Sequence, residues 1–420
     1  MSYATIALPV PVRQTFTYRV PPELEREAVP GAPVLVPFRG RDTRGVLIER
    51  MPTTALESVR DLREVLGPPV LDRHLLELAR WVSEYYLAPP GEVVSAMLPG
   101  GHRGFAGSRA RREAIEDPTV GLAIPERVTL TAPQQAAVRA ITDAVSRGGY
   151  QSFLLHGVTG SGKTEVYLHA IADALARDDN AQVLMLVPEI NLTPQLEARI
   201  AARFPGVPMA ALHSGLAEQP RALNWLAAHR GEARIVLGTR LAMLASLPNL
   251  ALILVDEEHD TSYKQQEGLR YSARDLALWR AKQRNIPVVL GSATPSLETW
   301  WRAEQTPTTR LTLSRRAQAE AVDDPAGDRR AEAVDHEGQA VDQGERAARA
   351  AELALERGQK DAERFGDRAA GDADGEAQRH QQPGQDAIHR GHPWPRSTER
   401  ASRLAGRQAC TPRMWAAVSA

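Results

Sequence analysis

Continuous hydrophobic runs alternate with amphipathic segments through the middle of the chain. The hydrophobic runs cover residues 153–155, 183–187, 235–237, 252–255 and 288–290. Segments with helical spacing lie between them, near 164–177, 193–203, 220–229 and 272–284. Strands that are hydrophobic along their whole length are typical of parallel sheets buried on both faces. The pattern therefore predicts an α/β fold over residues 127–316, with a parallel sheet between layers of helices.

Residues 1–100 follow a different pattern. Short runs of β-favouring residues alternate there with proline and glycine, at 5–10, 15–20, 33–38 and 45–49. Such runs predict a small β-rich domain. A helix is expected from about 72 to 85, because hydrophobic residues recur there at helical spacing.

Two further segments have the composition of chain that does not fold by itself. Residues 101–126 are rich in glycine and arginine, which predicts a linker. Residues 317–420 contain only twelve Val, Ile, Leu, Phe, Met or Trp side chains and no tyrosine. So few hydrophobic side chains cannot offset the entropy of ordering the chain, so we expect a disordered tail.

Composition excludes several classes of protein. The 51 basic and 52 acidic side chains give a net charge of −1, which excludes a globally basic nucleic-acid coat but not a local basic groove. Cys410 is the single cysteine, which excludes a disulfide framework and a cysteine-ligated metal site within this sequence. No hydrophobic run reaches the length of about 18 residues that a membrane span needs, and the N-terminus does not resemble a secretory signal. We therefore expect a cytoplasmic protein without a membrane partner.

The strongest chemical motif is GVTGSGKT at residues 157–164, between a hydrophobic run and a helical segment. It fits the phosphate-loop pattern, in which glycines let backbone amides turn around an anion at a helix N-terminus. Lys163 would reach the β- and γ-phosphates of ATP, and the Thr164 hydroxyl would bind Mg²⁺. The alternative is a chance glycine-rich turn. The expected nucleotide-binding residues of the loop are Gly157, Gly160, Ser161, Gly162, Lys163 and Thr164.

Two more motifs follow hydrophobic runs. Asp256 and Glu257 come directly after the run at 252–255, where Asp256 would hold Mg²⁺ and Glu257 would orient or deprotonate the attacking water. A solvated acidic turn is the alternative for this pair. The sequence GSATPS at 291–296 follows the next run, and its hydroxyl groups could hydrogen-bond the catalytic carboxylates. Lys163, Asp256 and Glu257 are thus the candidate catalytic residues.

These three motifs, in this order, resemble superfamily 2 helicases. Further segments resemble one family within that group, the PriA family of primosomal replication-restart helicases. The segments are FTYRVP at 16–21, VPF at 36–38, PEINLTPQ at 188–195, LHS at 212–214, GTR at 238–240, SYKQ at 262–265 and RYSARD at 270–275. The resemblance covers about residues 3–315.

The resemblance implies an activity and a set of partners. Family members recognise stalled replication forks, unwind DNA in the 3′-to-5′ direction with ATP and Mg²⁺, and initiate primosome assembly. They bind forked and single-stranded DNA, primosome proteins and single-stranded-DNA-binding protein. They also carry zinc on a cysteine-rich region, whose ligands this sequence does not contain. The implied fold is a RecA-like lobe behind a domain that binds the 3′ end of DNA.

The resemblance also implies DNA-binding residues. By position, Phe16 and Arg60 would belong to the pocket for the 3′ end, whereas plain strand packing is the alternative for Phe16. Family members often carry an acidic residue where Thr17 stands. Arg240 lies in a motif that touches the DNA backbone.

Two further implied sites lie in the α/β region. The loop YKQQEGLRY matches an aromatic-rich family loop in which Tyr263, Lys264 and Arg270 would contact single-stranded DNA. A solvated loop is the alternative. Gln134 matches the family's adenine-contacting glutamine, with a surface glutamine near a helix start as the alternative.

The sequence departs from the family in two places. Members insert a winged-helix domain before the ATPase lobe, for which residues 101–126 are too short. The resemblance ends near residues 316–322, where the family continues with its zinc region and a second lobe that supplies an arginine finger. The abrupt change of composition leads us to hypothesise a truncation or frameshift after about residue 320, which would impair turnover. The hypothesis fails if no alternative frame of the coding DNA encodes a cysteine-rich second lobe.

Three functions remain open at this stage. The first is an ATP-dependent DNA helicase of replication restart. The second is a non-enzymatic, nucleotide-sensitive scaffold that binds forks. The third is another superfamily 2 translocase, such as a repair or restriction motor. Binding that depends on a free 3′ end would separate the first two from the third.

Overall fold

A computed structural model describes residues 2–99, 129–192, 194–305 and 308–314. All of them fall within one compact unit. The predicted linker at 101–126 and the predicted tail at 317–420 lie outside the described residues.

The N-terminal region forms a five-stranded antiparallel sheet in the order β2-β1-β4-β3-β5. Its strands are β1 (Ser2–Ala7), β2 (Phe16–Val20), β3 (Pro33–Phe38), β4 (Arg41–Met51) and β5 (Glu64–Val65). Alternate residues point into its core, among them Ala4, Ile6, Tyr18 and Val34. This period of two is the reason that the short β-type runs could be recognised in the sequence.

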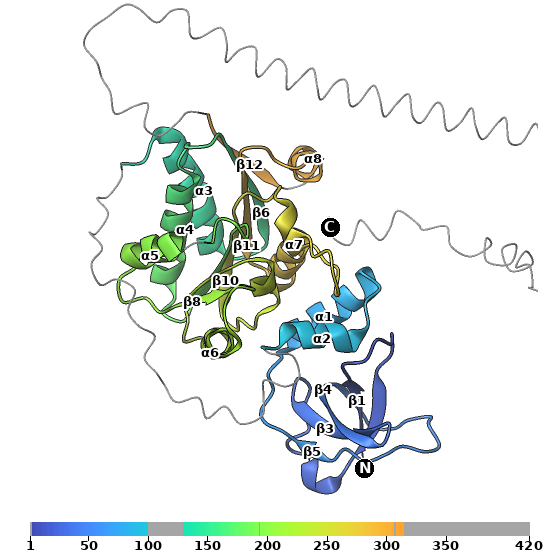
Figure 1. Cartoon of the computed structure of the whole chain (residues 1–420). Helices are drawn as coiled ribbons and strands as arrows, with labels where there is room; N and C mark the ends of the chain where they lie inside the picture. Colours follow the sequence, from blue (N-terminus) through green and yellow to red (C-terminus); the bar gives the residue numbers. More distant parts are fainter. Residues whose placement is uncertain (1, 100–128, 193, 306–307, 315–420) are drawn as a thin grey trace, which may run out of the picture. The chain divides into compact units, whose positions relative to one another are not determined.

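The second sheet has seven parallel strands in the order β12-β6-β11-β10-β7-β9-β8 (Figure 1). The strands are β6 (Gln151–Gly157), β7 (Gln182–Leu186), β8 (Met209–Leu212), β9 (Ile235–Gly238), β10 (Leu250–Val255), β11 (Pro287–Ser292) and β12 (Thr309–Leu313). The parallel sheet that the hydrophobic runs predict is confirmed. The two edge strands, β8 and β12, were not among the predicted strands.

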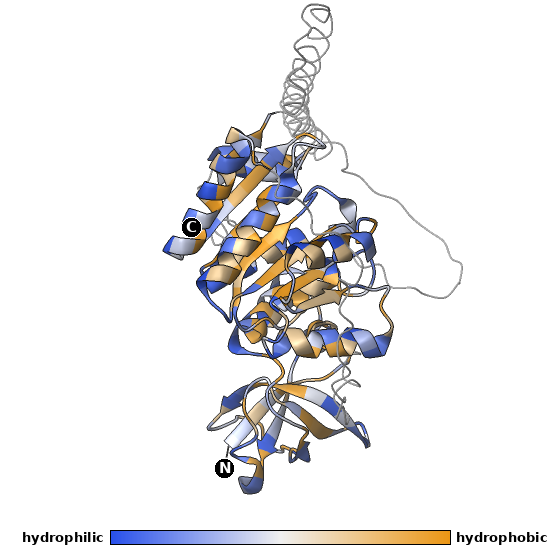
Figure 2. Cartoon of the chain, turned by 90° about the vertical axis from the view of Figure 1, so that its left-hand side faces the viewer, coloured by the Kyte–Doolittle hydropathy of each residue, from blue (hydrophilic) through white to orange (hydrophobic). Residues whose placement is uncertain are grey.

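Helices cover both faces of this sheet, and the hydrophobic strands lie between them (Figures 1 and 2). Along β10, Leu252 and Leu254 pack with one group of helices, whereas Ile253 and Val255 pack with the other. The first group is α3 (Ala132–Arg147), α4 (Lys163–Arg177) and α5 (Pro194–Arg203). The second includes α6 (Glu218–His229) and α7 (Ala273–Arg284). Burial on both faces explains why these strands lack polar alternation.

Three further α-helices lie in the described part of the chain. They are α1 (Arg73–Tyr85), α2 (Pro90–Met97) and α8 (Leu297–Gln305). Helix α1 corresponds to the helix expected at 72–85. Asp72 caps it by accepting a hydrogen bond of 2.8 Å from the Leu75 amide, and its second oxygen lies 2.8 Å from the Arg284 guanidinium.

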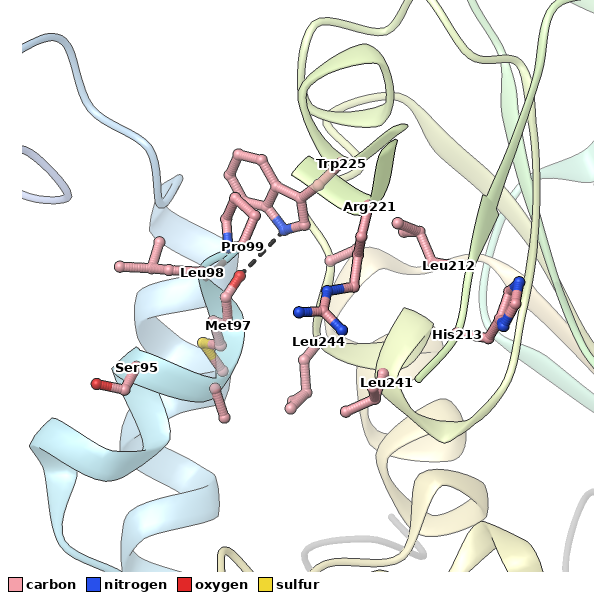
Figure 3. A pocket seen from close by; sticks show the side chains of 12 residues that line it. Ser95, Met97, Leu98, Pro99, Leu212, His213, Arg221, Trp225, Leu241 and Leu244 are labelled. Atoms are coloured by element: carbon pink, nitrogen blue, oxygen red, sulfur yellow. Dashed lines mark hydrogen bonds between the residues drawn. The ribbon is translucent and has the colours of Figure 1, made fainter. Parts of the chain in front are cut away.

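Helices α1 and α2 share a hydrophobic core with the α/β lobe. The indole of Trp225 donates a hydrogen bond of 3.1 Å to the Met97 carbonyl oxygen, at the rim of a cavity of about 320 Å³ (Figure 3). Leu98, Leu212 and Leu244 line this cavity. The two helices therefore pack with the lobe as well as with the sequence that precedes them.

Candidate functional site

The three chemical motifs follow three neighbouring strands of the parallel sheet. The phosphate loop follows β6, Ser292 ends β11, and Asp256 follows β10. These strands are adjacent in the order β6-β11-β10. Carboxyl ends of parallel strands lie at one edge of a sheet, which is where ligands bind in open α/β folds.

The backbone of the phosphate loop depends on glycine. Gly160 and Gly162 have φ angles of +83° and +80°, in the left-handed region that other residues rarely adopt. At Gly157, a Cβ atom would lie 2.5 Å from the Ser161 hydroxyl. The loop therefore closes tightly before α4 begins at Lys163, and the unpaired amides at the α4 N-terminus are suited to binding an anion.

Lys163 connects the loop to the acidic motif. Its ammonium donates a hydrogen bond of 3.0 Å to the Gly157 carbonyl oxygen and lies 3.2 Å from Glu257 Oε1. The lysine is 8% exposed, so its charge is largely shielded from water. An ammonium held beside a turn of backbone amides is suited to binding phosphate.

Ser161 supports the presence of a phosphate ligand independently. Its hydroxyl is buried and has no hydrogen-bond partner among the residues that the structure describes. A buried hydroxyl without a partner is unfavourable, and a phosphate oxygen in the loop would supply the missing bond. The residues present thus fit the phosphates of a nucleotide.

Asp256 is fixed by three hydrogen bonds. Its amide donates to the Leu186 carbonyl oxygen at 2.9 Å, its carbonyl oxygen accepts from the Tyr263 hydroxyl at 2.6 Å, and its Oδ1 atom accepts from the Tyr167 hydroxyl at 3.0 Å. Burial, and then the neighbouring charge of Glu257, raise the pKa of the Asp256 carboxyl. A cation such as Mg²⁺ would offset this cost, which fits a metal-binding role.

Glu257 has a strained backbone. Its φ angle is +45°, which is uncommon for a residue with a side chain. The turn directs its carboxylate toward Lys163 and brings its Oε2 atom to 3.6 Å from His259 Nδ1. Strain of this kind is concentrated at functional sites.

Hydroxyl groups at and after the end of β11 bind the acidic motif, but their partners are His259 and Glu258 rather than the catalytic carboxylates that the sequence suggested. Ser292 Oγ lies 2.7 Å from His259 Nδ1. The buried Glu258 carboxylate accepts hydrogen bonds of 2.7 Å from the Ser296 amide, 2.8 Å from the Thr299 hydroxyl and 3.2 Å from the Arg274 guanidinium. The sequence analysis gave Glu258 no role, although its place directly after the predicted catalytic pair was a signal.

Gln134 is buried, so the alternative of a surface glutamine is wrong. Its Oε1 atom accepts from the Thr131 amide at 2.8 Å, and its Nε2 atom donates to the Ser161 carbonyl oxygen at 2.9 Å. Gln134 therefore ties the start of α3 to the phosphate loop. Its contact with adenine stays a prediction.

The loop after the acidic motif divides into buried and exposed residues. Tyr263 is 2% exposed and bonds Asp256, so its ring is not available to stack on a base. The expectation that this ring contacts DNA is therefore corrected to a role in holding Asp256. Lys264 and Arg270 are exposed, and either can meet a phosphate from solvent.

Arg240 is engaged within the protein. Its guanidinium lies 2.9 Å from Glu189 Oε2, donates to the Ser262 carbonyl oxygen at 3.0 Å, and also bonds Gln265. Glu189 in turn accepts from the Ser214 hydroxyl. That bond and the nearby Arg240 charge lower the pKa of Glu189. A DNA phosphate would have to compete with this carboxylate for Arg240.

Phe16 and Arg60 do not line the same pocket in the structure. Phe16 packs edge-to-face on Phe38, with ring centroids 4.9 Å apart. Arg60 is exposed and lines a polar hollow of about 680 Å³ together with Arg19 and Arg63. Both residues remain predictions for DNA binding.

Over 2–99, 129–192, 194–305 and 308–314, no group of three or more His, Cys, Asp or Glu side chains has the geometry of a metal site. No helix in the same ranges is both long and hydrophobic enough to cross a bilayer.

Two domain families match the chain. Residues 5–99 match the 3′ DNA-binding domain of PriA proteins. Residues 131–300 match the DEAD/DEAH box helicase family. The second match contains the phosphate loop, the acidic motif and the motif after β11.

Curated relatives extend the resemblance. The replication restart protein PriA of Treponema pallidum is 36% identical over 316 residues, which cover 73% of this chain and 46% of that protein. The Haemophilus influenzae protein is 33% identical, covering 76% and 52%, and the Bacillus subtilis protein is 47% identical, covering 43% and 22%. The chain spans about half the length of the first and second of these relatives, and less of the third.

Among solved structures, RecG bound to a three-way DNA junction matches with a TM-score of 0.35 and 22% identity, over 45% of this chain and 24% of that chain. The helicase domain of Pyrococcus furiosus Hef matches with a TM-score of 0.32 and 19% identity, over 43% and 38%.

Proposed function

Because the chain carries a 3′ DNA-binding domain of the PriA type followed by a DEAD/DEAH-type helicase domain, we propose that it acts in replication restart as an ATP-dependent 3′-to-5′ DNA helicase. In this role it recognises stalled forks and initiates primosome assembly. The part of the chain that the structure describes supplies the fork-binding domain and one ATPase lobe.

One observation carries the proposal. The Lys163 ammonium, the orphaned Ser161 hydroxyl and the Asp256–Glu257 pair meet at the ends of adjacent strands, and Lys163 lies 3.2 Å from Glu257. A solvated acidic turn or a chance glycine-rich turn would not bring these groups together. The arrangement supports binding and hydrolysis of a nucleoside triphosphate.

The site residues have separate proposed roles in ATP binding and hydrolysis. Lys163 and the loop amides bind the phosphates, and Gln134 holds the loop against α3. Thr164 and Asp256 would hold Mg²⁺, which neutralises charge on the transferred phosphoryl group. Glu257 orients the attacking water and accepts its proton.

DNA is proposed to contact exposed basic residues near this site and in the N-terminal domain. Lys264 and Arg270 bind phosphates of the single strand, and Arg240 joins them when it leaves Glu189. Arg60 and Phe16 serve the 3′ end. Primosome proteins and single-stranded-DNA-binding protein are the proposed protein partners, and action at chromosomal forks implies a cytoplasmic location.

ATP hydrolysis by the purified chain tests the proposal. It is measured without DNA, with a fork that carries a free 3′-hydroxyl, and with the same fork blocked by a 3′-phosphate. We expect stimulation by the free 3′ end and its loss in Lys163→Ala. Binding of nucleotide and fork without turnover would replace the enzyme by a nucleotide-sensitive scaffold. Hydrolysis that is indifferent to the 3′ end would favour another superfamily 2 translocase.

A further inference from the structure

Two residues of α4, Lys163 and Tyr167, contact the two carboxylates that follow β10. Lys163 and Tyr167 are four residues apart, so their side chains lie on one helix face. Lys163 Nζ meets Glu257 Oε1 at 3.2 Å, and the Tyr167 hydroxyl meets Asp256 Oδ1 at 3.0 Å. The helix that begins at the phosphate loop thus holds both members of the acidic pair.

Tyr167 differs from an ordinary core tyrosine. Its side chain is 0% exposed, and its hydroxyl donates a hydrogen bond to the carboxylate of Asp256, which directly follows β10. A buried hydroxyl beside a carboxylate donates its proton, and such a charge-assisted bond is stronger and more directional than one between neutral groups. This bond restricts the orientation of the Asp256 side chain.

The backbone beside Tyr167 provides space for this hydroxyl. A Cβ atom at Gly291 would lie 1.6 Å from the Tyr167 oxygen. Any larger residue at position 291 in β11 would therefore displace the hydroxyl from Asp256. Gly291 opens the motif that follows β11, so three strand and helix elements meet at this one oxygen atom.

We propose that Tyr167 is a positioning residue for Mg²⁺-dependent nucleotide binding: its hydroxyl fixes the carboxylate of Asp256 in the orientation that serves the metal. The inference rests on the proposed function, because it assigns Asp256 to the metal. Asp256 is held in addition by Tyr263 and by the Leu186 carbonyl oxygen, but these bonds reach its backbone. The Glu257 amide also faces the Asp256 carboxyl, whereas Tyr167 supplies its side-chain hydrogen bond.

The substitution Tyr167→Phe tests the proposal, because it keeps the buried ring and removes one oxygen atom. Binding of a fluorescent ATP analogue to the full chain is titrated with Mg²⁺, and again in the presence of a chelator. We expect the Mg²⁺ concentration for half-maximal binding to rise about three- to tenfold. Affinity in the chelator stays within about twofold of wild type, because Lys163 and the loop are unchanged.

Tyr150→Phe is the matched control. Tyr150 precedes β6 in the same lobe, its hydroxyl bonds Ser152 rather than the acidic motif, and we expect its Mg²⁺ midpoint to equal that of wild type. A second measurement places Tyr167→Phe in the Asp256→Asn background, where it should cause no additional change in the Mg²⁺ midpoint.

The outcomes are distinguishable. A midpoint for Tyr167→Phe equal to that of wild type, or equal losses with and without Mg²⁺, would overturn the positioning role and leave the proposed function intact. An additive effect in the Asp256→Asn background would also overturn it. A wild-type chain that binds no nucleotide with Mg²⁺ would overturn the proposed function itself, and the inference with it.

Discussion

The ammonium of Lys163 lies 3.2 Å from Glu257 Oε1, where the lysine is buried and the glutamate side chain is 26% exposed. The phosphate-binding lysine is therefore paired with the proposed catalytic carboxylate. A nucleotide phosphate and Glu257 are both anionic, so they compete for the same charge. The ion pair joins the phosphate loop to the end of β10 and keeps Lys163 oriented toward the loop.

Glu257→Gln should separate binding from hydrolysis. The substitution removes the competing charge, so we expect affinity for ATP to equal that of wild type or to rise by up to about tenfold. Hydrolysis should fall by about 100-fold or more, because glutamine cannot accept a proton from water. Equilibrium binding and turnover are measured on the same samples. Asp173→Asn, which breaks the Asp173–Arg177 pair on α4, serves as the control, and a tenfold loss of binding in Glu257→Gln would contradict the competition.

Removal of the exposed basic residues should weaken binding to single-stranded DNA. Lys264→Ala and Arg270→Ala each remove one phosphate contact, so affinity should fall about three- to tenfold and the salt dependence should decrease by about 0.7 in log–log slope. Fluorescence anisotropy over a range of salt concentrations measures both. Arg139→Ala, at an exposed arginine on α3, should change neither. If the salt-dependence slope is unaltered in both Lys264→Ala and Arg270→Ala, these residues do not contact DNA phosphates.

Glu189→Gln should have the opposite effect. Glu189 holds Arg240 at 2.9 Å, so loss of its charge frees the guanidinium for a DNA phosphate. We expect affinity for single-stranded DNA to rise about two- to fivefold at low salt, with the gain shrinking as salt increases. Glu232→Gln, at an exposed carboxylate 3.9 Å from Arg230, is the control. Weaker binding would mean that Glu189 positions Arg240 for DNA instead of competing for it.

Stability should decrease in mild acid. Burial is the largest cause that lowers the pKa of His74, His156 and His229. The unfolded chain, with a histidine pKa near 6.5, then binds protons before the folded protein does, so stability is complete above about pH 6.5 and is lost as the pH falls below it. Thermal unfolding should occur at lower temperature at about pH 5.5 than at about pH 7.5.

His229 allows a specific test of this effect. It stacks on Trp225 with centroids 5.2 Å apart, and its Nδ1 atom lies 2.9 Å from Ser246 Oγ. His229→Asn removes one titrating group, so the difference in midpoint between the two pH values should shrink by about 2–4 °C. Because carboxylates contribute equally to both proteins, an unchanged difference would assign the acid sensitivity to other groups.

The central strands could be predicted from the sequence because burial on both faces makes them hydrophobic throughout, as in β10. The edge strands could not. Strand β8 is only four residues long and buries alternate residues, and β12 interrupts its leucines with threonine and arginine and buries Leu313 alone. For helix α3 the sequence indicated only the start, near Gln134, and the structure shows that Gln134 bonds the Thr131 amide there.

Some residues of the candidate site could likewise be predicted from the sequence, and others could not. Lys163 and Thr164 belong to a local motif whose spacing alone predicts its geometry. Tyr263 and Arg240 depend on packing between distant segments, and the sequence could not show that Tyr263 is buried or that Arg240 pairs with Glu189. Tyr167 was invisible for the same reason, because its partner lies 89 residues away along the chain.

Equilibrium binding of a fluorescent ATP analogue in the presence of Mg²⁺ is the decisive test of whether the phosphate loop and Lys163 bind a nucleotide. The wild-type chain and Lys163→Ala are titrated side by side, after thermal unfolding has shown that both are folded. We expect saturable binding by wild type and a loss of affinity of about tenfold or more in Lys163→Ala, because the ammonium at the phosphate loop is gone. Equal binding by the two proteins, or none by either, would contradict it.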